Sequence, residues 1–169
     1  MTNKACVHSP AMATFISKSP EQTQNLGAEW GRAAKEGWLI GLIGDLGAGK
    51  TQLVKGIARG LGITQRVASP TFALVHEYQG GRLTLCHIDL YRLDTPSQIA
   101  SAGLEDSIYS PQGVTVVEWI DRWFGSGVPD GWSSVDVSNR FETAPFYRHV
   151  RIALLNETQR EITYEDCSR

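Results

Sequence analysis

The feature that most constrains this chain is the octapeptide at residues 44–51, Gly-Asp-Leu-Gly-Ala-Gly-Lys-Thr, which matches G-x-x-x-x-G-K-[ST] at every fixed position. A continuous apolar run, residues 38–43, precedes it, and apolar residues at helical spacing follow it from Leu53 to Leu61. A buried strand, a glycine-rich turn and an amphipathic helix form the context in which this pattern binds phosphate. The sequence therefore predicts a phosphate-binding loop at residues 44–51.

Chemistry explains each fixed position of this loop. Its glycines let the backbone curl so that successive N–H groups point inward and form a nest for an anion, and the following helix directs its positive end at the same place. The Lys50 ammonium is expected to reach the β- and γ-phosphates, and the Thr51 hydroxyl to ligate Mg²⁺. The residues expected to bind the nucleotide here are Gly44, Asp45, Leu46, Gly47, Ala48, Gly49, Lys50 and Thr51.

Two acids stand at the ends of strand-like runs and are candidate ligands of a metal ion beside the phosphates. Asp89 ends the run 85–89, and Glu118 ends the run 114–118. Ligands bind at the carboxyl ends of strands in such sheets, so the two acids together indicate Mg²⁺ and an attacking water. The pattern leaves open which acid orients the water. Thr71, in a Ser-Pro-Thr segment, can offer a hydroxyl to the γ-phosphate, although such a segment is more often only a turn. Trp119, directly after Glu118, is expected to fill the core.

The remaining patterns predict an α/β fold: a P-loop NTPase-like sandwich with a mixed, mostly parallel central sheet extended by antiparallel hairpins. Ser19-Pro20 with Gln22 reads as a capped helix start. Residues 14–17 read as an edge strand, 72–78 and 82–89 as a hairpin, and 134–137 with 149–154 as a second ribbon. We expect one domain at residues 13–158, between tails at residues 1–12 and 159–169.

Composition narrows the class of protein. Acids number 18 and bases 16, a net charge of −2, which argues against a protein that wraps nucleic acid. Three cysteines form neither a disulfide framework nor a thiolate metal site, so reduced thiols in a cytoplasmic protein are expected. No apolar run approaches the ~20 residues that a membrane helix needs, and no membrane association is expected.

Four motifs in order, at residues 44–51, 69–72, 87–92 and 118–119, resemble the bacterial TsaE family, the ATPase of tRNA threonylcarbamoyladenosine synthesis. The resemblance covers roughly residues 15–154. It implies a compact ATPase that binds ATP and Mg²⁺, hydrolyses ATP slowly alone, and acts with TsaD and TsaB. Contact with tRNA would then be indirect, through that complex. The segment before Met12 and residues 124–146 match nothing in the pattern.

The resemblance also implies roles for single residues. Lys50 and Thr51 would bind phosphate and Mg²⁺, Glu118 would ligate Mg²⁺, and Asp89 would lie at the catalytic centre and remain a second metal candidate. A further set would contact the nucleotide: Thr71 in a switch-like loop, Trp119 in the response to nucleotide, and Ser19, Thr23 and Arg148 near the base.

Other classes of protein share the phosphate loop. A small-molecule kinase needs an acceptor pocket and a lid with arginines, and no arginine-rich insertion is visible. A GTPase-like switch needs an Asn-Lys-x-Asp guanine motif after a late strand, which is absent. A non-enzymatic nucleotide-gated module would bind ATP without turnover. ATP hydrolysis in an accessory protein is the hypothesis that the sequence favours, with the kinase as the alternative.

Overall fold

A computed structural model describes residues 12–124 and 144–168, which form a seven-stranded sheet in the order β1-β7-β6-β2-β5-β4-β3. The strands are β1 (Ala13–Ser17), β2 (Trp38–Ile43), β3 (Val75–Tyr78), β4 (Leu85–Asp89), β5 (Val114–Glu118), β6 (Phe146–Leu154) and β7 (Arg160–Ser168). Strands β6, β2, β5 and β4 run parallel, while β3, β7 and β1 pair antiparallel at the sides. The predicted fold class is confirmed.

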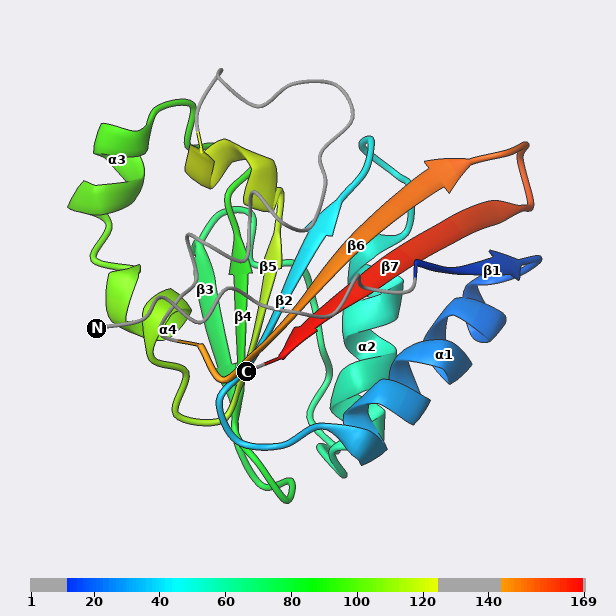
Figure 1. The fold of residues 1–169 in the computed structure, drawn as a ribbon, viewed down its shortest axis with the longest axis horizontal. Helices are drawn as coiled ribbons and strands as arrows, with labels where there is room; N and C mark the ends of the chain where they lie inside the picture. The colour runs from blue at the N-terminus through cyan, green and yellow to red at the C-terminus, as the bar shows by residue number, and fades with distance from the viewer. Residues whose placement is uncertain (1–11, 125–143, 169) are drawn as a thin grey trace, which may run out of the picture.

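Helices cover both faces of the sheet (Figure 1). Helices α1 (Pro20–Ala33) and α2 (Lys50–Gly60) lie on one face, and α3 (Pro96–Ser101), α4 (Glu105–Tyr109) and the 3₁₀ helix η1 (Ile120–Phe124) on the other. Residues of β2 alternate between the two cores: Ile40 and Leu42 face α1 and α2, and Leu39 faces the opposite side. A strand buried on both faces must be apolar throughout, which explains the run before the glycine-rich loop.

Helices α1 and α2 touch backbone to backbone through glycines. A Cβ on Gly27 would lie 2.4 Å from the Leu53 carbonyl oxygen, and one on Gly56 would lie 2.1 Å from the Gln24 carbonyl oxygen. Both distances are far inside van der Waals contact, so only glycine permits this packing. The contact fixes α2, and with it the loop that leads into α2, against the body of the protein.

The start of α1 agrees with the prediction from the sequence, with one difference. Ser19 caps the helix by accepting from the Gln22 N–H at 3.2 Å, and Pro20 is its first residue, as predicted. The Gln22 side chain, however, accepts from the backbone N–H of Lys18 at 2.8 Å, where a capping box would use that of Ser19. The cap therefore extends one residue further into the strand–helix connection.

The C-terminal part of the chain departs most from expectation. Residues 149–154 lie in β6, and its antiparallel partner is β7, Arg160–Ser168, in the segment that we expected to be a tail. The predicted domain end at residue 158 is therefore too early. Ile162 is fully buried and Tyr164 packs against the same core, which is the period-two pattern of a strand. Residues 134–137, the other half of the predicted ribbon, lie outside the described residues.

The hairpin of β3 and β4 is confirmed, but residues 72–74 form a turn before β3. Helices α3 and α4 were not expected from the sequence. Thr95 caps α3 by accepting from Gln98 N–H at 3.2 Å, and the Gln98 side chain accepts from Thr95 N–H at 3.2 Å. The Thr-Pro-x-Gln pattern at residues 95–98 was the available signal for this helix.

Candidate functional site

The glycine-rich loop joins β2 to α2 in a shape that its glycines make possible. Gly47 and Gly49 have φ values of +80° and +103°, in the region that other residues avoid, and open space surrounds both. At these two positions the backbone angle requires glycine. At Gly44 crowding requires it, because a Cβ would lie 2.4 Å from the Ile152 carbonyl oxygen of β6.

Lys50 is the first residue of α2, and its side chain turns back over the loop. Its Nζ donates to the carbonyl oxygens of Gly44 at 2.6 Å and Asp45 at 2.9 Å, and the residue is 4% exposed. Burial lowers the pKa of the Lys50 ammonium, and the nearby carboxylates, Glu118 foremost, oppose that shift. Neutral carbonyls are weaker acceptors than phosphate oxygens, so the ammonium is held where an anionic ligand would compete for it.

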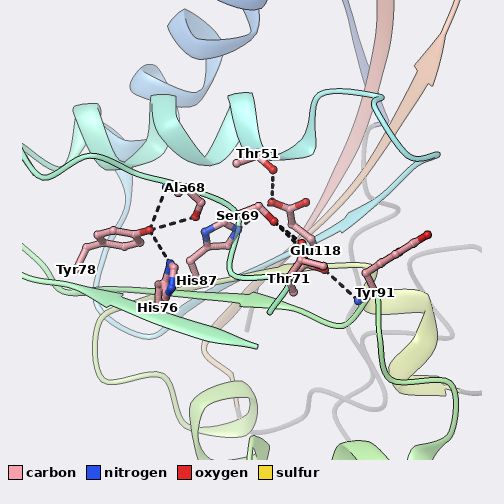
Figure 2. A network of polar contacts seen from close by, with 10 residues as sticks. Thr51, Ala68, Ser69, Thr71, His76, Tyr78, His87, Tyr91 and Glu118 are labelled. Carbon is pink, nitrogen blue, oxygen red and sulfur yellow. Dashed lines mark hydrogen bonds and ion pairs between the residues drawn. The ribbon is translucent and has the colours of Figure 1, made fainter. Parts of the chain in front are cut away.

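Strand register brings the two predicted acids together. Asp89 and Glu118 are direct partners at the carboxyl ends of β4 and β5, on the face covered by α2. Thr51 Oγ1 donates to Glu118 Oε1 at 2.8 Å, as Figure 2 shows. Within residues 12–124 and 144–168, no three acidic, cysteine or histidine side chains gather as a metal cage. A hydroxyl beside a carboxylate fits Mg²⁺, which keeps several waters and takes substrate phosphates as its other ligands.

Asp89 holds the Ser-Pro-Thr loop. Its Oδ2 accepts from Ser69 Oγ at 2.8 Å and from Thr71 Oγ1 at 2.6 Å, and its Oδ1 accepts from Tyr91 N–H at 3.0 Å. Asp89 is 2% exposed. Charge-assisted hydrogen bonds to a buried carboxylate are among the stronger ones, so this contact fixes residues 69–71 beside the strand ends. The structure thus joins Thr71 and Asp89, and their roles toward a nucleotide stay predictions.

Trp119 is partly buried and packs against the core on the face covered by α3 and α4, and its ring also contacts Lys50. Its backbone φ of +61° is unusual for a bulky residue. Lys50 Nζ lies 3.9 Å from its ring centroid, and the Tyr91 ring centroid lies 5.2 Å away. Left-handed backbone at a non-glycine residue stores strain of order 1–3 kcal/mol and is enriched at functional sites. The core contact expected from the residues is present, and the response to nucleotide that the resemblance implies for Trp119 stays a prediction.

The three residues predicted near the base have polar atoms engaged by other parts of the protein. Ser19 caps α1, and Thr23 Oγ1 lies 2.8 Å from Ser17 Oγ in a buried pair. Arg148 donates from Nε and Nη2 to Asp166, each at 2.6 Å. In the described part of the chain, no hydrogen bond joins the side chains of Ser19, Thr23 or Arg148 to residues 44–51. Their contact with a base stays a prediction.

Two residues at the site escaped the sequence analysis. His87 is fully buried, and its Nε2 lies 2.9 Å from Glu118 Oε1. Asp121 has a buried carboxylate oxygen with no described hydrogen-bond partner, and its charge raises the pKa of Lys50. A signal existed for His87, because it stands two residues before Asp89 and so shares its face of the strand. Asp121 lies in η1, an element that the sequence did not predict.

This fold and loop define an α/β protein in which a glycine-rich loop joins a central parallel strand to a helix, with acids at the ends of the neighbouring strands. Residues 17–150 match the family model described as Threonylcarbamoyl adenosine biosynthesis protein TsaE. The chain belongs to the TsaE family.

Individual relatives agree with this assignment. A Nostoc protein named tRNA threonylcarbamoyladenosine biosynthesis protein TsaE is 47% identical over 114 residues, 66% of this chain and 70% of its own. A Treponema pallidum protein of the same name is 44% identical over 107 residues, 63% of this chain and 78% of its own. The crystal structure of Bacillus subtilis YdiB is similar with a TM-score of 0.70 at 30% identity, covering 95% of this chain and 89% of that one. In the described part of this chain, every helix is too short or too polar to cross a bilayer.

Proposed function

We propose that this chain binds and hydrolyses ATP with Mg²⁺, and that it serves as an accessory protein in the threonylcarbamoyladenosine modification of tRNA, acting in the cytoplasm with TsaB and TsaD. The names of its relatives support a role in tRNA threonylcarbamoyladenosine biosynthesis. The observation that carries the ATPase proposal is the placement of Lys50 and Thr51 at the start of α2, with Thr51 already bonded to Glu118. Contact with tRNA would be made through the partner complex.

Phosphate binding would rest on backbone amides and one ammonium. The amides of the loop and of the first turn of α2 form a positive end for the triphosphate, and Lys50 adds a full charge at 4% exposure. Water is largely excluded from this ammonium, so its attraction for phosphate oxygens is less screened than at an open surface. Lys50 would leave the Gly44 and Asp45 carbonyls to reach the β- and γ-phosphates.

Thr51 and Glu118 would hold the cation, with Asp89 as the further candidate. When bound, Mg²⁺ supplies positive charge to the β- and γ-phosphate oxygens. In hydrolysis a water oxygen forms a bond to the γ-phosphorus while the bond to the ADP oxygen breaks, and the proton from water leaves with phosphate. Asp89 or Glu118 would orient that water, and the Thr71 hydroxyl would reach toward the γ-phosphate.

Phosphate release tests this proposal most directly. Purified protein with Mg²⁺ and ATP, and no acceptor molecule, is expected to release phosphate slowly. Release that depends on an added small-molecule alcohol or acid would instead support the kinase alternative. Tight ATP binding with no release, even with the partner complex present, would identify a nucleotide-gated binding module.

A second measurement tests the partnership. Immobilised TsaB–TsaD complex is incubated with this chain in the presence of ATP, of ADP or of no nucleotide. Capture that depends on ATP is the expected result. Equal failure of capture in all three conditions, by a chain that hydrolyses ATP alone, would contradict the accessory role and leave the ATPase in place.

A further inference from the structure

His87 is a buried polar residue that the proposed ATPase chemistry has not yet used. It lies in β4, is 0% exposed, and places Nε2 2.9 Å from Glu118 Oε1 (Figure 2). Its other ring nitrogen, Nδ1, is buried with no hydrogen-bond partner in the described part of the chain. Buried polar atoms without hydrogen-bond partners are rare and destabilise the fold by about 1–3 kcal/mol. A buried residue with such an atom is therefore expected to serve a purpose other than stability.

The contact fixes which ring nitrogen carries a hydrogen toward Glu118. A carboxylate only accepts hydrogen bonds, so Nε2 carries the hydrogen and donates it to Glu118. Nδ1 is then the ring nitrogen left without a hydrogen-bond partner in the described part of the chain. An apolar side chain of similar size would avoid this penalty, and its absence points to the bond with Glu118 as the function of the residue.

Two donors converge on the same oxygen of Glu118. Thr51 Oγ1 lies 2.8 Å from Oε1, and His87 Nε2 lies 2.9 Å from the same oxygen. No hydrogen bond joins the other oxygen, Oε2, to any residue of the described ranges. The pair of donors therefore fixes the rotation of the carboxylate and leaves one oxygen available to a ligand.

We propose that His87 is a positioning residue that holds Glu118 in the orientation needed to bind Mg²⁺ with the nucleotide. The inference rests on the proposed function, because it assigns His87 a part in the same cation site. Hydrogen bonds to metal-ligating carboxylates orient them, and their loss typically weakens metal affinity about 10- to 100-fold. His87 itself does not contact the cation or the phosphates in this proposal.

The chain offers a matched control. His76 of β3 is the direct cross-strand partner of His87, but its Nδ1 contacts the Tyr78 hydroxyl at 3.2 Å and not Glu118. Figure 2 shows the two rings on the same side of the sheet, with His87 nearer to Glu118. A substitution at His76 removes the same type of side chain from the same region without touching the acid.

The experiment separates cation binding from nucleotide binding. ATP affinity is measured by calorimetry for the wild type, His87→Leu and His76→Leu, once with Mg²⁺ and once with EDTA. Mn²⁺ affinity is measured by paramagnetic resonance in the presence of a non-hydrolysable ATP analogue. For His87→Leu we expect unchanged ATP affinity in EDTA and Mn²⁺ binding weakened about 10- to 100-fold. His76→Leu is expected to bind Mn²⁺ like the wild type.

Two polar variants keep the test decisive if His87→Leu does not fold. His87→Gln places its amide nitrogen near the position of Nε2, whereas the shorter His87→Asn places it near Nδ1. We expect Mn²⁺ affinity near that of the wild type for Gln and a loss for Asn. Equal Mn²⁺ affinity in the wild type and in folded His87→Leu or His87→Asn would overturn the proposal.

The two proposals fail in different ways. A wild-type protein that binds no ATP in Mg²⁺ or in EDTA would overturn the proposed function and this inference together. A wild type that binds Mg²⁺ and ATP normally, with His87 variants that match it, would overturn only the role of His87. If the substitution of His87 weakens Mn²⁺ binding as much in a Glu118→Gln background as in the wild type, the proposal is also overturned, because His87 would then act through another group.

Discussion

The ammonium of Lys50 lies 3.9 Å from the centre of the Trp119 ring, so the charged group of the loop and an indole at the end of β5 are in direct contact. The same ammonium donates to two loop carbonyls. Movement of Lys50 toward a phosphate would therefore change the surroundings of Trp119. This contact links the occupancy of the loop to a spectroscopic reporter.

Trp119→Phe tests that link. The chain has five tryptophans, and we expect nucleotide binding to change the fluorescence of the wild type but not of this variant. Phenylalanine keeps an aromatic face for the ammonium, so ATP affinity should fall by less than about 10-fold, in line with a cation–π contribution of about 0.5–1 kcal/mol. Trp123→Phe serves as the control, and a response that persists in Trp119→Phe would contradict the assignment.

Lys50→Ala is expected to weaken ATP binding about 10- to 150-fold, because hydrogen bonds to a charged group contribute about 1.5–3 kcal/mol. Calorimetric titration measures the loss. The matched control is Lys55→Ala, which removes a lysine from the same helix five residues further on, at the lining of a different hollow. Similar losses in both variants would mean that general charge, and not the position of Lys50, governs binding.

Asp89→Ala is expected to release the loop at residues 69–71. The substitution removes the acceptor of three hydrogen bonds, two of them from the Ser69 and Thr71 hydroxyls. Faster amide hydrogen exchange across that loop should accompany a drop in phosphate release of at least about tenfold. Thr71→Val removes a single hydroxyl and should show a smaller increase in exchange. Unchanged exchange in Asp89→Ala would show that other contacts order the loop.

Gly56→Ala is expected to lower the melting temperature through the contact between α1 and α2. The added Cβ would lie 2.1 Å from the Gln24 carbonyl oxygen, and backbone atoms at this distance must move apart. Overpacking of this kind destabilises by about 1–3 kcal/mol, or roughly 2–10 °C for a chain of this size. Gly62→Ala, where a Cβ meets only open space at φ +82°, provides a comparison limited to backbone strain.

His149 is expected to make stability depend on pH between about 4 and 6.5. Burial lowers the pKa of His149 from 6.5 to about 4, against the opposing charge of Glu165. In this range the unfolded chain binds a proton that the folded chain does not, so the free energy of unfolding rises with pH and levels off above 6.5. The whole effect is on the order of 3 kcal/mol. Urea unfolding at several pH values should show a flatter profile for His149→Gln.

The sequence was most informative where a local pattern and a buried environment coincide. The run before the loop, the glycines at residues 44–49 and the acid at each strand end could all be predicted, because hydrophobic continuity and backbone angle constrain residue choice there. His87 could not be assigned a partner, since only the pairing of β4 with β5 brings it to Glu118. The strand β7 was missed because its charged outer residues obscure a short alternation around Ile162.

The first strand of the sheet pairs with the last: β1 lies at the sheet edge, and β7 separates it from β6. During synthesis β1 has no neighbour in the sheet until residues 160–168 have left the ribosome. The residues of the glycine-rich loop, of α2 and of the two acids have been synthesised well before that time. The residues that form the candidate site are therefore synthesised before the strand that pairs with β1.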